Sequence, residues 1–461
     1  MLLTSLLSLF LSWRTVFAQS RLYRRAVRLA LGSLSVVGTA TLTRILASQG
    51  RDKQDWTADY RLFSQRTWSP NHLFDALLPT ALGHYPDHGP VVMALDDTRL
   101  RKVGKRIATA GWHRDPLSPA FHTNLHWGLR FLAGSLLLPL YRESKSPPRA
   151  LPLRFTDIPP VKKPGRRASE EEWQQFKEQQ KQHNLSTYAV TMARSLRTTL
   201  DEAGVSNRTV LLVGDNSFCH RRVLRAEWDR VSWLVRARKD AVLCFRAPAG
   251  ARRIYAKERF TPESVRQDKE RDWKQTRIWH AGKHRLVRYK EVPEVLWRTG
   301  TQQRSLRLIV LAPTRYRRYR KNRKRNYYRA PAYLLTTDRS SSVKQLVQAY
   351  LDRWQIEVQH KEIKDTLGAG QAQVRVQASV ERQPAFVVAC YTALLLASLE
   401  AFGTQRAGDY EPLPKWRRNA TRPSCQDLMG LLRREIVQQS KVLEEFDLET
   451  NHERLVRKAA A

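Results

Sequence analysis

The pattern of apolar and polar residues changes several times along the chain and predicts a helical beginning, an α/β middle and a helical end. Residues 1–85 carry apolar side chains at mixed spacings of three and four, with no Gly or Pro before Gly32, which is typical of successive helices. At residues 90–95 the pattern becomes a short unbroken apolar run, PVVMAL, which leads into Asp96 and Asp97. Such a run predicts a buried strand that carries an acid at its tip.

Other apolar runs predict the remaining strands of the α/β region, at residues 122–132, 135–141, 209–213, 231–246 and 332–336. Ser169, followed by three Glu residues, predicts the start of a polar helix, and a second helix is expected over residues 187–203. The stretch 147–167 is rich in Pro, Lys and Arg and is predicted to be a surface loop. A long helix is predicted from about residue 342 to residue 367.

These changes of pattern divide the chain into five predicted segments. They are a helical N-terminal domain (1–85), a core in two parts (86–245 and 331–405), a β-rich insertion (246–330) and a helical C-terminal region (406–461). Strand-like pieces at 284–290 and 305–312 indicate the insertion. Residues 385–402 are apolar enough for a membrane span, but Glu400 and the modest length favour a buried core helix.

The charge of the chain indicates a polyanionic partner, which the apolar pattern alone does not. It has 81 Lys and Arg against 43 Asp and Glu, a formal charge of +38 spread along its length. Nucleic acid is the commonest polyanion to which such dispersed cations bind favourably, because each phosphate contact releases counterions. The run RYRRYRKNRKR at 315–325 is expected to follow phosphates through its first four arginines, with a solvated loop as the alternative. Those arginines are Arg315, Arg317, Arg318 and Arg320.

Two further features concern the compartment. The four cysteines show no paired spacing, so neither a zinc ribbon nor a disulfide framework is indicated, and a reducing cytoplasm fits. Residues 2–13 resemble the apolar region of a signal peptide, but no positive residue precedes them and arginines follow instead. The first helices of a helical domain are therefore favoured over secretion, which leaves a secreted cationic protein as a distant alternative.

Three acids on different predicted elements are the candidate chemical groups. Asp96 follows one strand, Asp215 follows the strand 209–213, and Glu357 lies on the long helix. Phosphodiester transfer by two metals needs carboxylates that converge on a pair of Mg²⁺ ions about 4 Å apart, and acids at strand ends and on a packed helix meet that need. Each aspartate alone would usually be a turn residue.

The long helix gives the sharper signal, because Tyr350, Arg353, Glu357 and Lys364 form a Y-x2-R-x3-E-x6-K pattern in AYLDRWQIEVQHKEIKDTLGAG. Counted from Tyr350, the other three residues follow at offsets of 3, 7 and 14, which place all four side chains near one stripe of a helix that turns about 100° per residue. A carboxylate beside two cations and a phenol is an odd core face but a sensible way to bind metal and phosphate together. Simple packing or solvation of these side chains is the alternative.

With this pattern the sequence resembles the insertion-sequence DDE transposases, which carry the Y-R-E-K signature on an RNase H-like fold. The resemblance runs from about residue 91 to residue 401. The family's first acid lies in a short D-x-T pattern, matched by Asp96-Asp97-Thr98; its second follows an apolar strand, matched by VLLVGD at Asp215; its third is the signature Glu, matched by Glu357. Asp97 is the alternative to Asp96, since neighbouring strand residues face opposite sides and only one can reach the metals.

The resemblance implies an α/β fold: an RNase H-like mixed sheet core with a β-rich insertion and helical N- and C-terminal regions. It implies that Asp96, Asp215 and Glu357 hold two Mg²⁺ ions, with Mn²⁺ as a substitute, and that Tyr350, Arg353 and Lys364 contact DNA. The implied reaction is cut-and-paste transposition. Trp297 in the insertion is a candidate to receive a flipped base, with a structural role as the alternative.

The implied partners are double-stranded DNA, as terminal inverted repeats and target, and a second copy of the chain in a synaptic homodimer. No membrane is implied, and the expected location is the bacterial cytoplasm at the nucleoid. A non-catalytic, domesticated DNA-binding descendant of a transposase is the alternative function.

Overall fold

The computed structural model describes residues 1–65, 68–115, 118–119, 121–142, 146–316, 327–417 and 420–439. Contacts divide the chain into two compact units. Unit 1 comprises Met1–Asp87, Asp97–His183 and Gln355–Ala461, and unit 2 comprises His88–Asp96 and Asn184–Trp354. These units cut the chain differently from the five segments expected from the sequence, whose boundaries stay a prediction.

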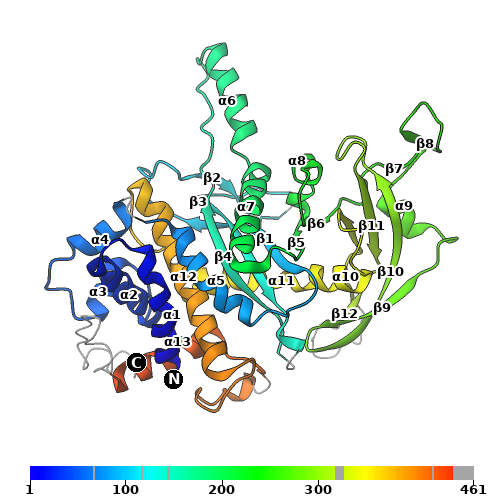
Figure 1. Ribbon diagram of the computed structural model, residues 1–461. Helices are drawn as coiled ribbons and strands as arrows, with labels where there is room; N and C mark the ends of the chain where they lie inside the picture. The colour runs from blue at the N-terminus through cyan, green and yellow to red at the C-terminus, as the bar shows by residue number, and fades with distance from the viewer. Residues whose placement is uncertain are drawn as a thin grey trace. The chain divides into compact units, whose positions relative to one another are not determined.

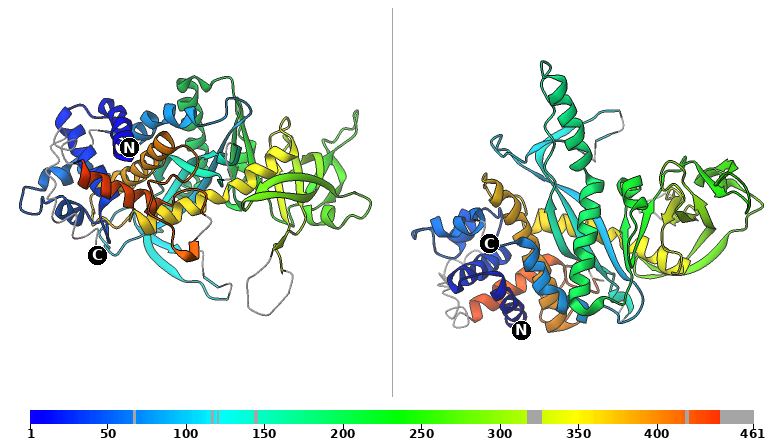
Figure 2. Two further views of the ribbon diagram at one scale, coloured as in Figure 1. Left: turned by 90° about the horizontal axis from the view of Figure 1, so that it is seen from below. Right: turned by 45° about the horizontal axis from the view of Figure 1, so that its top comes forward.

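Unit 1 begins with helices, as the apolar spacing predicts. They are α1 (Leu2–Leu11), α2 (Ser20–Ser35), α3 (Leu42–Ser48), α4 (Thr57–Ser64) and α5 (Pro70–Gly83). The N-terminal helices lie beside α12 (Gln377–Phe402), as Figures 1 and 2 show, and the ring centroids of Trp13 and Phe386 are 5.9 Å apart. Among the described helices α12 alone is long and apolar enough to cross a membrane, and 83% of its most apolar window is buried in the fold. The interpretation of this segment as a core helix is therefore confirmed.

The strands of unit 1 centre on β3 (Leu125–Leu138), which pairs antiparallel with β2 (Gly111–Arg114) and β4 (Arg149–Asp157) and also neighbours β1 (Val91–Arg101). The sequence predicted two strands, at 122–132 and 135–141, where the structure has β3 alone. The pairing of β3 with β4 shifts register between Gly134 and Ser135. The extra residue, Leu153, lies on β4, so β3 itself runs without interruption through the Ala133-Gly134 pair that separates the two predicted strands.

The prediction of a surface loop over 147–167 is wrong for its first half, because β4 is a buried strand. Its arginines are satisfied inside the fold: Arg154 lies 2.7 Å from the Asp75 carboxylate, and Arg149 donates to the Pro423 carbonyl at 2.8 Å. Buried cations are tolerated when they are paired and hydrogen-bonded, so composition alone could not reveal this strand. The next helix, α6 (Glu170–Gln182), is exposed and begins with the Ser169–Glu172 capping box, as predicted. The last helix of the unit is α13 (Cys425–Gln438).

Unit 2 contains a mixed sheet. The first half of β1 pairs in parallel with β5 (Val210–Gly214), and β5 pairs in parallel with β6 (Val231–Arg236). The sheet continues through β14 (Ala332–Thr336), β11 (Ser305–Leu311), β10 (Lys283–Leu296), β7 (Leu243–Arg246) and β8 (Tyr255–Phe260), with β9 (Lys274–His280) on β10. Its helices are α7 (Leu185–Leu200), α8 (Arg221–Arg225), α9 (Pro262–Gln267) and α10 (Val343–Asp352). The strands between residues 246 and 330 agree with the expected β-rich character.

The helix predicted over 342–367 has the expected extent but is interrupted. It begins at Ser342 with a capping box to Gln345 and forms α10, then continues after Arg353 as α11 (Trp354–Lys361). Residues Glu362–Thr366 form a π turn, in which the Leu367 amide donates to the Glu362 carbonyl at 3.1 Å. The division between the two units falls inside this helical segment.

Asp157, at the end of β4, gives unit 1 a dependence on pH. Burial, together with repulsion from Glu381, raises the pKa of its carboxyl to about 7, whereas an unfolded aspartate titrates near 4. Between about pH 4 and 7 the folded protein therefore binds more protons than the unfolded chain, and stability falls as pH rises. The free energy of unfolding should fall by roughly 2–4 kcal/mol more across this window in the wild type than in Asp157→Asn. Urea unfolding at several pH values measures this difference.

Asp365→Asn is the matched control, since Asp365 is exposed in the π turn and should leave the pH profile as in the wild type. Equal pH profiles for the wild type and Asp157→Asn would show that Asp157 does not contribute.

Candidate catalytic site

Asp96 and Asp215 lie level with each other on neighbouring parallel strands of unit 2. The register of β1 and β5 runs residue for residue from Val91 opposite Val210 to Ala94 opposite Val213. Asp215 itself keeps an extended backbone, with φ −79° and ψ −166°. Continuing the register by two residues therefore brings Asp96 opposite Asp215, at the ordinary spacing of about 4.8 Å between strands.

The two aspartates also face the same side of the sheet. Alternation places Asp96 on the face of Val92, and Asp215 on the face of Leu211 and Val213. Val92, Leu211 and Val213 all pack in one hydrophobic cluster with the apolar residues of α10. The carboxylates of both aspartates are thus directed to the face that α10 covers further along the strands.

Asp97 points to the other side of β1 and has a structural role there. Its carboxylate lies 2.8 Å from Nε of Arg130 on β3 and 3.8 Å from Arg99. The expectation that the acids sit at the tip of this strand is wrong, because β1 continues to Arg101. The pairing of β1 with β3 carries the strand beyond the acids, which the apolar run alone could not show.

Asp215 follows β5 as expected and caps a short 3-10 turn. Its Oδ1 accepts from the Ser217 amide at 2.8 Å, and its Oδ2 from the Ser217 hydroxyl at 3.4 Å. These bonds fix the side-chain orientation of the carboxylate at the end of the strand, while Asp215 stays partly exposed.

Glu357 lies on α11 in unit 1, so the structure does not place it against the two aspartates of unit 2. The helix is held by its opposite side. Arg422 donates to Gln355 at 3.2 Å, and the Ser135 hydroxyl donates to Gln359 at 2.7 Å. At about 100° per residue, Glu357 lies roughly 200° around the axis from Gln355, away from these anchors.

The π turn that follows is anchored on the same side as Gln355 and Gln359. Glu362 accepts a hydrogen bond from the Tyr391 hydroxyl of α12, and its carboxylate lies 3.8 Å from Arg149 of β4. Burial lowers the pKa of the neighbouring Arg422 and, together with the Glu362 charge, raises the pKa of Tyr391. This buried polar network fixes the rotation of the Glu357 helix within unit 1.

The other signature residues are divided between the units. Tyr350 is half-buried on α10, where it packs against the hydrophobic cluster of unit 2, and Arg353 joins α10 to α11. Lys364 lies within the π turn of unit 1. The pKa of His126 is lowered mainly by burial, then by the charges of Arg101 and Arg99, and to a smaller extent by the charge of Lys364. The predicted single stripe assumes uniform α-helical rotation, which the π turn does not follow at Lys364.

Only the start of the basic run lies within the described residues. Arg315 is exposed on β12 (Arg315–Tyr316), which pairs with β13 (Tyr327–Tyr328) as a two-stranded ribbon in unit 2. Arg317, Arg318 and Arg320 lie outside the described residues. Trp297 forms the turn after β10, where its carbonyl accepts from Gly300 and Thr301.

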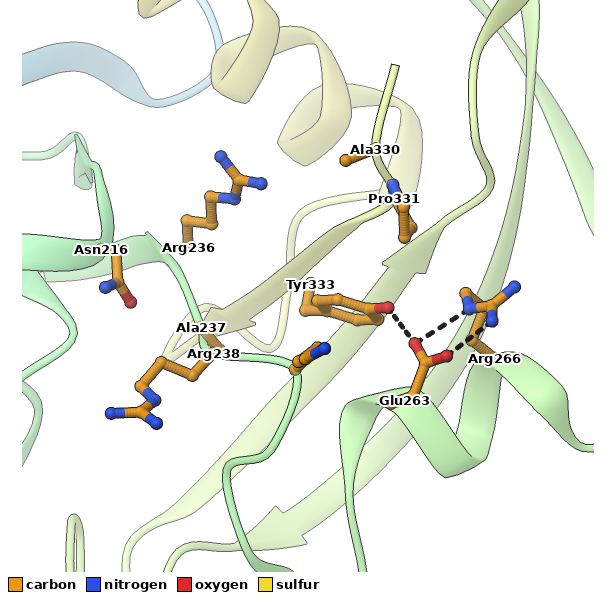
Figure 3. Close-up of a pocket in the computed structure, with 10 residues that line it drawn as sticks. Asn216, Arg236, Ala237, Arg238, Glu263, Arg266, Ala330, Pro331 and Tyr333 are labelled. Atoms are coloured by element: carbon orange, nitrogen blue, oxygen red, sulfur yellow. Dashed lines mark hydrogen bonds and ion pairs between the residues drawn. The ribbon is translucent and has the colours of Figure 1, made fainter. Parts of the chain in front are cut away.

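A cationic pocket of about 650 Å³ begins one residue after Asp215, and the sequence analysis did not anticipate it (Figure 3). Its polar lining is Asn216, Arg236, Arg238, Lys239, Glu263, Arg266 and Tyr333. Arg236, Arg238 and Lys239 form a short basic run at the end of β6 and just after it, and Arg266 comes from α9. This run is a local signal of positive charge, but no local pattern links it to Arg266.

The single carboxylate among the lining residues of the pocket is already paired with a cation. Glu263 lies 2.5 and 2.9 Å from the Arg266 guanidinium and accepts from the Tyr333 hydroxyl (Figure 3). The guanidinium holds the pKa of Glu263 at about 2, so this acid stays charged and paired. Arg238 is likewise paired with Asp240. Within the described residues, Arg236 and Lys239 make no side-chain hydrogen bond or ion pair, so their charges are available to an anion.

The fold and these acids together define a class, that of α/β proteins with aspartates on adjacent parallel strands, where divalent cations are commonly held. Residues 179–393, slightly less than half of the chain, match the family model of the transposase DDE domain. The chain therefore carries a transposase DDE domain, and the predicted resemblance to insertion-sequence DDE transposases with an RNase H-like fold is confirmed. A comparison with curated proteins gave no match.

The matched segment includes Asp215, Glu357 and the whole signature, and it begins after Asp96. DDE transposases act on DNA and generally use divalent metal ions. The oxygen donors of Asp96 and Asp215 suit a hard cation such as Mg²⁺. Among the described residues, no group of three or more His, Cys, Asp or Glu side chains is close enough to form a complete metal site.

Proposed function

We propose that the protein is an active DNA transposase, which cleaves the ends of its element and joins them to target DNA with Asp96, Asp215 and Glu357 as catalytic carboxylates. The observation that carries the proposal is the level, same-face position of Asp96 and Asp215 on adjacent parallel strands. The assignment of Glu357 rests on the signature and on the helix network that turns it away from the core of unit 1.

In this mechanism Asp96, Asp215 and Glu357 would hold two Mg²⁺ ions. When bound, these ions lower the pKa of the attacking water or 3′-hydroxyl and stabilise the leaving oxygen. Asp215 presents its carboxylate in an orientation already fixed by Ser217. Asp97 keeps β1 attached to Arg130, so that Asp96 on the opposite face stays in position.

Arg353 and Lys364 are cations and would bind phosphates rather than metal. We assign them, with Tyr350, to holding the DNA backbone so that the scissile phosphate lies over the carboxylates. The exposed Arg315 of β12 would add a phosphate contact, and we assign DNA contacts from the sequence pattern to Arg317, Arg318 and Arg320, which lie outside the described residues.

The cationic pocket extends this DNA-binding surface beside Asp215. Its cations Arg236 and Lys239 are suited to one or two phosphates of the same strand, and the buried Tyr333 is among the residues that line it. The element would move within the bacterial cytoplasm at the nucleoid, and pairing of two DNA ends would require a homodimer at that stage.

The catalytic acids can be tested by replacing each with Ala and measuring single-turnover cleavage of DNA that carries the element's terminal repeat. Asp96→Ala, Asp215→Ala and Glu357→Ala should cleave at least a hundredfold more slowly in Mg²⁺, about 2.7 kcal/mol, while binding DNA within a few fold of wild type. Asp97→Asn is the control: it should unfold more easily, because Arg130 loses its partner, but should cleave. Loss of cleavage in Asp97→Asn with retention in Asp96→Ala would exchange their roles.

Arg353→Ala and Lys364→Ala should slow the same cleavage by at least tenfold, about 1.4 kcal/mol, because positioning errors raise the barrier more than they weaken binding. The exposed Lys361→Ala on the same helical segment should react as wild type. A Mg²⁺ titration separates the possibilities. A defect that extra Mg²⁺ fully rescues would instead mean that these residues support the metal site.

The pocket can be tested by its contribution to the salt dependence of binding. Arg236→Ala combined with Lys239→Ala should lower the slope of log affinity against log salt by about one to two, because each lost phosphate contact releases about 0.9 fewer ions. The exposed turn pair Arg252→Ala with Arg253→Ala, also in unit 2, is the matched control. Equal slopes for the pocket variant and the wild type would remove the pocket from the DNA surface.

A further inference from the structure

The β2–β3 ribbon of unit 1, formed by Gly111–Arg114 and the first residues of β3, exposes aromatic side chains on one face. Trp112 lies opposite Trp127, with ring centroids 5.6 Å apart, and Arg114 lies opposite Leu125 on the same face. Trp112 is 66% exposed and Leu125 is 58% exposed. The Trp127 indole donates to the Gly104 carbonyl at 3.1 Å, which fixes the ring against which Trp112 rests.

The segment that leads into this ribbon carries charges of one sign up to Arg114. Residues 98–114 contain no Asp or Glu, and their exposed cations are Arg101, Lys105, Arg106 and Arg114. Val103, in the same segment, is 95% exposed. The nearest acid along the chain, Asp115, lies 3.7 Å from Arg101. Apolar side chains set among cations complement a polyanion with flat apolar surfaces rather than an ordinary protein partner.

The opposite face of the ribbon carries two histidines. His113 and His126 lie opposite each other there, with ring centroids 6.2 Å apart. Burial and the charge of Arg99 lower the pKa of His113, and burial with Arg101 and Arg99 lowers the pKa of His126. Since burial is the larger cause and a lowered pKa favours the neutral imidazole, these histidines do not add to the positive charge of the ribbon.

We propose that this ribbon is a DNA-docking element that enters a groove of duplex DNA, with Trp112 against the sugars and base edges and Arg114 on the phosphate backbone. A two-stranded β-ribbon fits the major groove of B-DNA, and apolar side chains at such tips pack on or between base steps. The proposal rests on the proposed function, since it concerns how the same substrate is held. It adds a contact surface that lies before the segment matching the DDE domain.

The test is fluorescence anisotropy of the full-length protein on a labelled 30-base-pair duplex without Mg²⁺, at several salt concentrations. Trp112→Ala should weaken binding at least fivefold with an unchanged salt slope, because no charge is lost, and Trp112→Phe should restore part of the affinity. Arg114→Ala should lower the slope by about one. Trp416→Ala is the matched control, since Trp416 is 89% exposed in the same unit, and it should bind as wild type.

Unchanged affinity in folded Trp112→Ala together with an unchanged slope in Arg114→Ala would overturn the proposal. So would an equal loss in Trp416→Ala, or a change in the sedimentation of DNA-free protein by Trp112→Ala without any change in DNA binding, which would identify a second copy as the occupant. A wild-type protein that binds no duplex would instead contradict the proposed function. Arg114→Ala keeps the test open if Trp112→Ala fails to fold.

Discussion

The parallel pairing of β1 with β5 is the constraint on which the candidate site depends. Side chains repeat every two residues on a strand, so a slip of one position would turn either aspartate to the opposite face. The pairing from Val91 opposite Val210 to Ala94 opposite Val213 prevents such a slip, because it buries both strands against α10. The chemistry proposed for Asp96 and Asp215 is thus a consequence of how a hydrophobic cluster is packed.

The same packing gives two adjacent aspartates different surroundings. Asp97 faces Arg130 and Arg99, where a carboxylate is neutralised by the fold, whereas Asp96 faces the side of Asp215. Like charges on neighbouring strands are unfavourable unless a cation compensates them. The proposed binding of divalent metal would compensate this repulsion between two carboxylates that the backbone holds level with each other.

The sequence predicted these elements best where local pattern and tertiary structure agree. The run before Asp96, the strand before Asp215 and the signature helix were all identified, because their apolar periodicity is strong. The failures have physical causes: β4 contains buried arginines that are paired with acids distant in sequence, and β3 continues through the Ala133-Gly134 pair that divides its apolar pattern. The pocket beside Asp215 is built from residues far apart in sequence, and no local rule could bring Arg236 and Arg266 together.

Because of the π turn at Glu362–Thr366, the number of residues between two members of the signature does not by itself give the angle between their side chains around the helix axis. Seven residues separate Glu357 from Lys364, which is nearly two full turns of a regular α-helix. A turn that closes on the fifth residue instead of the fourth uses one more residue for the same rotation. Relative to Glu357, Lys364 is therefore rotated less far around the axis than it would be in a regular α-helix. The two charged side chains thus point in neighbouring directions and do not lie on one line. A linear motif gives the number of residues between two groups, but the backbone conformation sets the angle at which the two groups face a ligand.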